Sequence, residues 1–451
     1  MLPDFYTCNI AIIGLGYVGL PLCIQFKKIK KCLLTGKDFK RKIIGFDINT
    51  KRIEQLQNQI DITNEVSGED LNLIKDIYLT SNPDLLAEVD IFIVTVPTPV
   101  DKAKSPDLEP LKKASKTIGL ALPKRNKKDR KTIPFIIYES TVYPGATEEI
   151  CVPIIEKISG FSLNNQNTEN SFLCGYSPER INPGDKTHNL DKIVKVTSGS
   201  SPEASELIDK LYKTIISAGT FKAASIKVAE TAKIIENTQR DINIALMNEL
   251  AMINKKLGID TLDVLEAAGT KWNFLKFKPG LVGGHCIGVD PYYLTYKASM
   301  LGYTPEMVLS GRRINDSMQN WVVEQFILEI SKNKISLKNV TILILGLTFK
   351  ENCPDLRNSK SIEIINQLSK YSNNIDLIDP IANQEEAKEI FGVQILKKIP
   401  FNKKYSAILV LVGHNYFKQI TLEEWQELLN PVSIIFDIKG IVSKDLSPIR
   451  I

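Results

Sequence analysis

The sequence predicts an α/β protein in which two Rossmann-like, doubly wound units are joined by a long central helix and a helical middle. Short apolar runs end in a glycine or an acid in both halves of the chain, and stretches with helical period lie between them. Because strands that alternate with helices form parallel βαβ units, we expect a parallel sheet in each half. In the first half the expected buried strands are residues 8–13, 43–47, 91–97 and 134–140.

The second half repeats this pattern on a smaller scale, with IAIIGLG echoed by TILILGL and GFD echoed by LID. Between the halves, the stretch that ends at Gly258 contains neither glycine nor proline and predicts a helix of roughly nine turns. An earlier helix is expected after Ser201, a suitable N-cap residue. Further strands are expected within 340–350, 375–380, 406–414 and 433–440, and domains at 1–212, 213–325 and 326–451.

The composition excludes several classes of protein. The 451 residues include 57 Lys and Arg against 52 Asp and Glu, and a net charge of +5 gives no case for nucleic-acid binding. Seven cysteines without a CxxC pair, together with three histidines, indicate neither a disulfide framework nor a metal site, and they fit a reducing compartment. Two basic stretches, Lys27–Lys42 and Lys124–Lys131, are expected to be solvated loops, with a patch for acidic ligands as the alternative.

An uncharged stretch from Phe5 to Phe26 could be mistaken for a membrane span or a signal peptide. It has no basic segment before it and no small-residue cleavage site, and it holds three glycines and a proline. A strand, a tight turn and a helix explain it better. We therefore expect a cytoplasmic protein without a membrane segment.

The turn in this stretch, Gly14-Leu-Gly16-Tyr-Val-Gly19, has the GxGxxG pattern of dinucleotide-binding folds. Gly14 permits the tight turn, Gly16 lets the backbone approach a pyrophosphate, and Gly19 allows the helix to pack closely on the strand. Asp47 ends the second strand and is expected to accept ribose hydroxyls, which favours NAD over NADP. Arg52 is expected near the adenine, with a 2′-phosphate contact left open. The alternative for the whole motif is a glycine-rich turn without a ligand.

Polar residues also follow two strands and line one side of the expected long helix. Thr98 and Thr141 lie at strand ends, where ligands bind in open α/β sheets, and are candidate cofactor contacts; turn formation is the alternative for each. Lys233, Asn237 and Arg240 are four and three residues apart and share a helix face. A lysine and an amide one turn apart can hold a substrate oxygen that gains negative charge, and a solvent-exposed polar face is the alternative.

The segment from Gly280 to Tyr293 carries the clearest chemical signal. Three glycines in five residues predict a loop that admits a ligand near the backbone, and Cys286 follows, with Asp290 four residues later. A structural cysteine usually lies in an apolar run rather than after GGH, so Cys286 is a candidate nucleophile. His285 is interpreted as a loop or packing residue rather than a base.

Taken together, these motifs resemble those of the nucleotide-sugar 6-dehydrogenases, the family of UDP-glucose, UDP-N-acetylhexosamine and GDP-mannose dehydrogenases. The resemblance covers nearly the whole chain. The motifs that carry it are GLGYVGLP, VPTP, EST-x-x-PG, YSPER, AETAKIIENTQRDINIALMNEL, GLVGGHCIGVDPYYL and GLTFKENCPDLRNS.

This resemblance implies a four-electron oxidation, in which the C6 alcohol of a sugar becomes a carboxylate at the expense of two NAD⁺ and one water. Cys286 would attack the C6 aldehyde to give a thiohemiacetal, whose oxidation gives a thioester that water hydrolyses. Lys233 and Asn237 match the residues that hold the C6 oxygen, and Glu179, in YSPER, matches the base for hydrolysis. Two further residues match positions that assist the catalytic water: Asp290 and Thr141.

The resemblance also implies binding residues and roles for the three domains. Residues 1–212 would bind NAD, 213–325 would carry the cysteine loop and the dimer contact, and 326–451 would bind the UDP-sugar. The expected cofactor contacts are Gly14, Gly16, Tyr17, Val18, Gly19, Asp47, Arg52, Thr98, Thr141 and Arg357. The expected substrate contacts are Glu179, Arg180, Ile181, Lys233, Asn237, Arg240, Gly280, Lys350 and Arg357.

The cysteine loop indicates one branch of the family. UDP-glucose members tend to carry a GFGGSCFPKD-like loop, whereas GLVGGHCIGVDPYYL, with SPERINPGD upstream, is similar to the UDP-N-acetylhexosamine branch. The expected substrate is therefore a UDP-N-acetylhexosamine (glucosamine, galactosamine or mannosamine) used in surface polysaccharide synthesis, and the long helix implies a homodimer. Lys439, in FDIKG, stands where some members carry an arginine, so no contact is assigned to it.

Three other functions stay open. The first is a UDP-glucose or GDP-mannose 6-dehydrogenase with the same mechanism. The second is a two-electron β-hydroxyacid-type dehydrogenase, which would use Lys233 and Asn237 but not Cys286. The third is a catalytically silent protein that binds NAD or a UDP-sugar, which an intact set of chemical groups disfavours.

Overall fold

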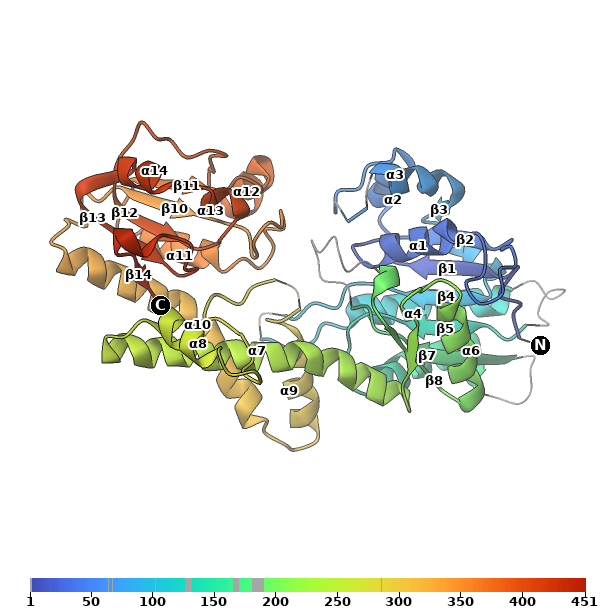
Figure 1. Cartoon of the computed structure of the whole chain (residues 1–451). Coiled ribbons are helices and arrows are strands. Elements are labelled where there is room, and N and C mark those ends of the chain that lie inside the picture. The colour runs from blue at the N-terminus through green and yellow to red at the C-terminus, as the bar shows by residue number, and fades with distance from the viewer. Residues whose placement is uncertain are drawn as a thin grey trace. The chain divides into compact units, whose positions relative to one another are not determined.

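The structure is a computed structural model that describes residues 2–63, 65–66, 68–101, 103–125, 132–164, 170–180, 190–284 and 286–451. The chain forms two compact units (Figure 1). The first comprises Met1–Glu236 and Tyr292–Tyr303, and the second comprises Asn237–Pro291 and Thr304–Ile451. The division into three domains that begin at residues 1, 213 and 326 stays a prediction.

The first unit is built on a mostly parallel sheet. Among the described residues its strands follow the order β3-β2-β1-β4-β5-β7-β8-β9, with β6 paired to β7 and β8 antiparallel to β7. The four expected strands are present as β1 (Asn9–Ile13), β2 (Lys42–Phe46), β4 (Ile91–Val94) and β5 (Phe135–Tyr138). The strands that were not expected are β3 (Tyr78–Thr80), β6 (Ser162–Leu163), β7 (Ser171–Tyr176), β8 (Lys195–Gly199) and β9 (Thr220–Lys222).

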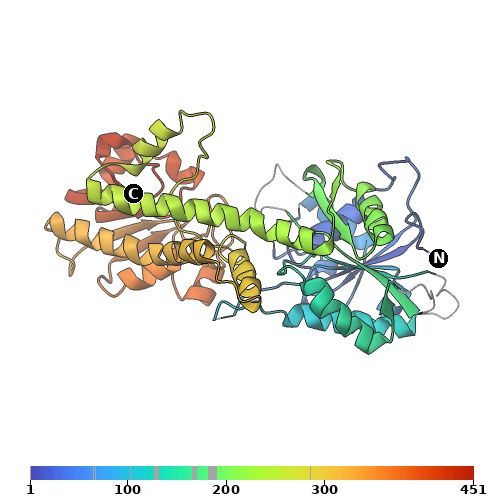
Figure 2. The ribbon, with the colours of Figure 1, turned by 90° about the horizontal axis from the view of Figure 1, so that it is seen from below.

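Helices cover both faces of this sheet, as Figure 2 shows. One face is covered by α1 (Gly19–Lys28) and α6 (Pro202–Lys213), and the other by α4 (Glu109–Ala121) and α5 (Val152–Ser159). Leu20 and Leu211 pack with Ile10 and Ile12 in the core on the first face. Ala11 and Ile13, which alternate with them and point to the other face, are also buried, so the sheet is apolar on both sides at β1 as predicted. The expected cap of α6 is confirmed, because the Ser201 hydroxyl accepts the amide of the third helical residue at 3.1 Å.

The long central helix is confirmed. Helix α7 runs over Ile226–Leu257, and its 32 residues make about nine turns at 3.6 residues per turn. It ends before Gly258, whose φ of +72° lies in the left-handed region that glycine adopts without strain. Neither α7 nor any other helix among the described residues is both long enough and apolar enough to cross a membrane.

The second unit contains a smaller parallel sheet. The strand order among the described residues is β11-β10-β12-β13-β14. The bounds are β10 (Ile342–Leu345), β11 (Ile375–Ile378), β12 (Tyr405–Val410), β13 (Leu429–Asp437) and β14 (Ile449–Arg450). On one face α10 (Glu306–Lys332) and α11 (Ser361–Leu368) pack on the sheet, and Phe326 meets the edge of Phe436 with ring centroids 5.9 Å apart. The predicted α/β class with two parallel sheets is confirmed.

Shorter helices complete both units. In the first unit α2 (Thr50–Gln57) and α3 (Gly68–Leu71) follow β2. In the second unit α13 (Asn415–Lys418) and α14 (Leu422–Glu427) cover the face of the sheet opposite α10, where Phe417 and Trp425 are buried. The remaining helices are α8 (Thr261–Ala268), α9 (Asp290–Met300) and α12 (Gln384–Phe391).

The echo between the two halves of the sequence reflects a shared turn geometry. In each unit the first strand of the pattern ends in a glycine with φ near +97°, and the amide of the next residue donates to the acid that ends the neighbouring strand, at 2.8 Å. The equivalent residues are Gly14, Leu15 and Asp47 in the first unit and Gly346, Leu347 and Asp379 in the second. The same local solution therefore closes both strand–turn motifs.

The basic stretches are only partly solvated, which corrects the expectation for two arginines. Arg41 is buried: its guanidinium stacks 3.3 Å from the centroid of Phe39 and donates to the hydroxyl of Thr214 at 3.1 Å. Arg125 is buried beside Asp90, with an ion-pair distance of 2.9 Å. In these two places the basic stretch supplies a structural cation rather than a solvated charge. Residues 126–131 lie outside the described residues.

Candidate active site and cofactor pocket

The glycine-rich turn of the first unit has the geometry that a dinucleotide requires. A Cβ on Gly14 would lie 3.2 Å from the backbone of Thr95, and a Cβ on Gly19 would lie 1.8 Å from the carbonyl oxygen of Gly14. These two positions therefore accept only glycine. A Cβ on Gly16 would meet nothing within 4 Å, so the space above the turn is open for a ligand.

A cavity of about 710 Å³ lies at this turn, at the carboxyl ends of β1, β2 and β4. That volume is within the range of natural ligand sites, and this edge of a doubly wound sheet is where ligands bind. The lining residues come from the turn, from the ends of β2 and β4, from α2 and from one side of α4, and they include Gly14, Gly16, Asp47, Arg52, Thr95, Pro110 and Thr117. Tyr17 and Val18, which are half-buried, lead from the turn into α1.

Asp47 and Arg52 both line the cavity and both brace the turn. The Asp47 carboxylate accepts the amides of Leu15 and Asn49 at 2.8 and 2.9 Å. A carboxylate has about four lone-pair sites, so two remain for the hydroxyls of a ribose. Arg52 is buried and donates to the carbonyl oxygen of Leu15 at 2.9 Å and to Asp61 at 2.8 Å. Its Nη1 has no hydrogen-bond partner within the described part of the chain. These groups fit a bound dinucleotide.

The two candidate threonines are joined to each other. The Thr98 hydroxyl donates to the carbonyl oxygen of Thr141 at 2.7 Å, and the Tyr293 hydroxyl donates to the carbonyl oxygen of Thr98 at 2.7 Å. The Thr98 side chain therefore ties the loop after β4 to the loop after β5. The prediction that Thr98 and Thr141 also contact the cofactor stays a prediction.

Glu179 lies just after β7 and is buried. Burial raises the pKa of its carboxyl group to about 7, although the ammonium groups of Lys233 and Lys195 act in the opposite direction. A carboxyl group with such a pKa can exchange protons near neutral pH, as a general base must. The adjacent Arg180 pairs with Glu236 of α7 at 2.9 Å, and the expected contact Ile181 lies outside the described residues.

Helix α7 presents its candidate residues differently from the exposed polar face considered as the alternative. Lys233 and Asn237 are both buried, whereas Arg240 is exposed. The Asn237 amide donates to Asp290 at 2.7 Å, and the Asp290 amide donates to the carbonyl oxygen of Cys286 at 2.8 Å. The structure thus brings the cysteine loop, Asp290 and Asn237 together within the second unit.

Cys286 differs from the other cysteines in its exposure. All seven belong to the described residues, and Cys286 is partly exposed while the other six are buried. Burial raises the pKa of the Cys8 and Cys151 thiols to about 12, which keeps them protonated at neutral pH. Accessibility therefore singles out Cys286 as the candidate nucleophile.

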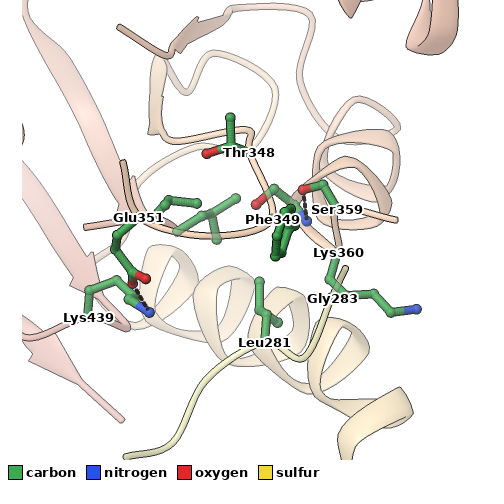
Figure 3. A pocket seen from close by; sticks show the side chains of 11 residues that line it. Leu281, Gly283, Thr348, Phe349, Glu351, Ser359, Lys360 and Lys439 are labelled. Carbon is green, nitrogen blue, oxygen red and sulfur yellow. Dashed lines mark hydrogen bonds and ion pairs between the residues drawn. The ribbon is translucent and has the colours of Figure 1, made fainter. Parts of the chain in front are cut away.

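Gly283 and Gly284, the glycine pair before the cysteine, lie close to another segment of the second unit. A Cβ on Gly283 would lie 2.7 Å from the carbonyl oxygen of Asn358, and a Cβ on Gly284 would lie 2.8 Å from the ring of Phe349. Figure 3 shows Gly283 and Leu281 beside this ring. The chain itself therefore fills the space next to Gly283 and Gly284, and admission of a ligand near the backbone of this loop stays a prediction. Gly280 faces open space, with no atom within 4 Å of a built Cβ.

The loop that contacts the glycine pair is fixed by a buried histidine that the sequence did not indicate. His414 accepts the amide of Asn352 on Nδ1 at 3.0 Å, so its proton is on Nε2, which lies 3.2 Å from Asp379 and 3.1 Å from the Thr348 hydroxyl. Thr348 in turn donates to the carbonyl oxygen of Lys350 at 3.1 Å. The Lys350 backbone, in an expected substrate-binding segment, is thereby held in place.

Two further residues near this loop, Arg357 and Lys439, form ion pairs within the second unit. Arg357 forms a bidentate pair with Asp355, at 2.9 and 2.7 Å, and its side chain is about half exposed. Lys439, which received no role from the sequence, forms an ion pair with Glu351 at the edge of the small pocket in Figure 3. Binding of substrate or cofactor by Lys350 and Arg357 stays a prediction.

Asn248 of α7 holds the start of the cysteine loop. Its side chain accepts the Gly280 amide at 2.8 Å and donates to the Gly280 carbonyl oxygen at 3.1 Å, and it also donates to Asn315 of α10 at 2.8 Å. These contacts are buried, and no motif in the sequence indicated them. The side-chain amide of Asn248 thus pairs with both backbone groups of Gly280, as a neighbouring strand would in a sheet.

We expect Asn248→Ala to destabilise the protein by about 1–3 kcal/mol, because it leaves the buried Gly280 amide and carbonyl unsatisfied. We also expect kcat to fall, since the loop that carries Cys286 loses its tether, while NAD affinity stays unchanged. Thermal denaturation, NAD titration and steady-state kinetics check this. Asn243→Ala is a matched control on the same helix, because the side-chain amide of Asn243 donates to the carbonyl oxygen of Gln239 one turn earlier in α7 rather than to the cysteine loop. A wild-type kcat in Asn248→Ala would contradict the expected tether.

Comparison with known proteins decides the family. The profile of the UDP-glucose/GDP-mannose dehydrogenase family, NAD binding domain, matches residues 8–216, the central domain matches 227–317, and the UDP binding domain matches 343–444. The chain belongs to the UDP-glucose/GDP-mannose dehydrogenase family. Its first unit therefore contains an NAD-binding domain, in agreement with the open cavity at the glycine-rich turn.

Individual relatives are similar over almost the whole chain. UDP-N-acetyl-D-glucosamine 6-dehydrogenase of Pseudomonas aeruginosa is 50% identical over 443 residues, covering 98% of this chain and 99% of the relative. The enzyme of the same name from Salmonella typhi is also 50% identical, covering 98% of each chain. Among solved structures, a UDP-D-ManNAc dehydrogenase from Pyrococcus horikoshii has a TM-score of 0.80 at 26% identity, covering 97% of this chain and 96% of the other. The expected family, the NAD cofactor and the NAD-dependent nucleotide-sugar dehydrogenase class are confirmed.

Proposed function

We propose that the protein oxidises the C6 hydroxyl of a UDP-N-acetylhexosamine, with UDP-N-acetylglucosamine as the preferred substrate, to the corresponding uronic acid. The observation that carries this proposal is the 50% identity, over 98% of the chain, to two proteins named UDP-N-acetyl-D-glucosamine 6-dehydrogenase. The partly exposed Cys286 supports the four-electron reaction over the two-electron alternative, which needs no thiol.

In the first oxidation C6 loses a hydride and the proton of O6 passes to water, which gives an aldehyde. NAD⁺, when bound, accepts one hydride in each of the two oxidations. Lys233 and Asn237 stabilise the negative charge that develops on O6 as its proton leaves. Asp290 accepts a hydrogen bond from the Asn237 amide at 2.7 Å and so fixes which way the amide points. Both Lys233 and Asn237 are buried, which strengthens their interaction with a developing charge.

The thiolate of Cys286 then attacks C6 of the aldehyde. A carbon–sulfur bond forms and the carbonyl π electrons move to oxygen. Protonation of that oxygen by water gives the tetrahedral thiohemiacetal. Loss of the remaining C6 hydride and of the hydroxyl proton converts this adduct to a thioester. The sulfur adduct is needed because a bare aldehyde is a poor hydride donor, whereas the tetrahedral adduct re-forms a carbonyl as the hydride leaves.

Hydrolysis releases the product. Glu179 takes a proton from water, the water oxygen bonds to C6, and the carbon–sulfur bond breaks to leave the acid and the Cys286 thiolate. A pKa of about 7 leaves about half of the Glu179 carboxyl groups ionised at neutral pH, so base and conjugate acid are both available. Thr141, in the loop after β5, helps to position the water.

We expect two NADH per molecule of UDP-sugar oxidised. The test is a panel of UDP- and GDP-sugars scored for NADH at 340 nm and for product by mass spectrometry. UDP-N-acetylglucosamine should give the highest kcat/KM. One NADH per sugar with a stable carbonyl product would contradict the thioester route, and a preference for UDP-glucose or GDP-mannose would move the protein to another substrate branch.

We also propose that the protein is a cytoplasmic homodimer that supplies an acidic nucleotide sugar for surface polysaccharide synthesis. Helix α7 supports a dimer, because five of its apolar side chains are about half exposed or more along one face: Val228, Ile235, Leu246, Ile253 and Leu257. We expect a mass near 101 kDa, twice the 50.6 kDa of the chain, by light scattering. Charged substitutions at Ile235 and Leu246 should shift this mass to that of the monomer, and a wild-type monomer would contradict the dimer.

A further inference from the structure

A buried ion pair lies behind the loop that carries Glu179. The ammonium of Lys195, the first residue of β8, is 2.7 Å from the carboxylate of Glu139, the residue that follows β5. Their side chains are 3% and 0% exposed. The other oxygen of Glu139 accepts a hydrogen bond from the hydroxyl of Tyr212 on α6. Three separate elements of the first unit thus share one buried polar cluster.

This cluster is connected to both loops that carry predicted hydrolytic residues. Besides pairing with Glu139, the Lys195 ammonium donates to the carbonyl oxygen of Pro178 at 3.1 Å, and Pro178 directly precedes Glu179. Glu139 lies two residues before Thr141 in the chain. The ion pair therefore joins the backbone that orients Glu179 to the backbone that orients Thr141.

Stability alone is a weak reason for such a pair. Removing two charges from water costs several kcal/mol, and packed apolar side chains of similar volume often stabilise a core as well or better. Most strands of this sheet bury apolar side chains, although β8 also buries Thr197 and Ser198. A buried pair that reaches a catalytic loop through a backbone hydrogen bond is better explained by positioning.

We propose that Glu139 and Lys195 are positioning residues that hold Glu179 in place, relative to Thr141, for hydrolysis of the Cys286 thioester. This inference rests on the proposed function, because it assigns the hydrolytic base to Glu179. The pair acts through Glu179 and the loop at Pro178, and neither Glu139 nor Lys195 touches the sugar.

The charges around Glu179 make the two partners distinguishable. Among the described residues, the largest effects of charge on Glu179 come from Lys233 of α7, Lys195 of β8, Glu139 after β5, and Glu65 in the loop after α2. Lys233 and Lys195 lower the pKa of Glu179, whereas Glu139 and Glu65 raise it. Removing Glu139 and removing Lys195 must therefore move the titration of Glu179 in opposite directions, although both changes disrupt the same ion pair.

The experiment compares Glu139→Gln and Lys195→Met with the wild-type enzyme in rapid-mixing and pH studies with UDP-N-acetylglucosamine and NAD⁺. In both variants we expect a burst of two NADH per site at nearly the wild-type rate, followed by turnover that is about tenfold slower or more. The acidic limb of the pH profile should move by about one pH unit, to lower pH in Glu139→Gln and to higher pH in Lys195→Met.

A matched control is Asp90→Asn, which removes the carboxylate of the Asp90–Arg125 pair. Asp90 directly precedes β4 and so lies at the opposite end of the sheet from Glu139, which follows β5. This substitution should lower the melting temperature without shifting the acidic limb of the pH–rate profile. An unmoved limb in Glu139→Gln, or limbs that move in the same direction in the two variants, would overturn the positioning role. Glu139→Gln decides alone if Lys195→Met does not fold, because glutamine keeps the shape and can still accept the Tyr212 hydroxyl.

Comparison with Glu179→Gln distinguishes failure of the positioning role from failure of the proposed hydrolytic base. If Glu179→Gln hydrolyses the thioester at the wild-type rate, the assignment of the base fails, whatever the ion pair does. If Glu179→Gln stalls after two NADH while Glu139→Gln and Lys195→Met behave like Asp90→Asn, the base stands and the positioning role is rejected.

Discussion

Replacement of Cys286 by Ser is expected to reduce steady-state turnover by about a thousandfold or more and to limit NADH formation to at most one equivalent per site. The serine hydroxyl is far less acidic than a thiol, so at neutral pH it supplies no anion to attack the C6 aldehyde. Without that adduct the second hydride has no tetrahedral donor. Stopped-flow absorbance at 340 nm measures the burst, and mass spectrometry of quenched wild-type enzyme should find the sugar attached to Cys286.

The control for this substitution is Cys8→Ala. Cys8 is buried, and burial raises the pKa of its thiol to about 12, so it takes no part in nucleophilic chemistry. Cys8→Ala should keep wild-type stoichiometry with a modest loss of stability. Full turnover by Cys286→Ser, or wild-type enzyme that accumulates acid without any adduct at residue 286, would refute the covalent route.

The sequence was sufficient for several strands that are continuous apolar runs, although the apolar strand β7 was missed, and it failed for β8, whose burial is largely polar. Strands β1, β4 and β10 are continuous apolar runs and were predicted. Strand β8 was missed because Lys195, Thr197 and Ser198 are buried polar residues, which hydrophobic periodicity assigns to loops. Each of the three has a partner far along the chain: Glu139, Asp209 and the carbonyl oxygen of Tyr176, respectively. Such partners exist only once the fold has formed.

The candidate site shows the same division between local and tertiary information. GxGxxG could be interpreted from the sequence because the spacing of its glycines is itself a known pattern and Gly19 meets the carbonyl oxygen of Gly14 in its own turn, although the atoms nearest to Gly14 belong to Thr95. Gly283 and Gly284 could not, since the ring and the carbonyl group that require them belong to Phe349 and Asn358, more than sixty residues later. The buried hydrogen bonds between the Asn248 side chain and Gly280 likewise have no motif near either residue that could predict them.

Replacement of Glu179 by Gln is expected to slow product release by about a hundredfold or more without abolishing the NADH burst. Both oxidations precede hydrolysis, so two NADH per site should form and the thioester should accumulate on Cys286, where a mass shift reveals it. In wild type, the ionised fraction of a group with a pKa of about 7 rises from roughly a tenth at pH 6 to roughly nine-tenths at pH 8. Hydrolysis should increase over that interval, because only the ionised carboxylate can take a proton from water.

A second carboxyl group makes a control essential. Burial also raises the pKa of Glu230 to about 7, and its carboxylate accepts the amides of Gly145 and Thr147. A pH limb near 7 could therefore arise from either group. Glu230→Gln should lower stability, because one carbonyl oxygen replaces two acceptors, yet keep the limb, whereas Glu179→Gln should remove it. Loss of the limb in Glu230→Gln alone would transfer the pH dependence to the structural carboxylate and leave hydrolysis without Glu179 as its base.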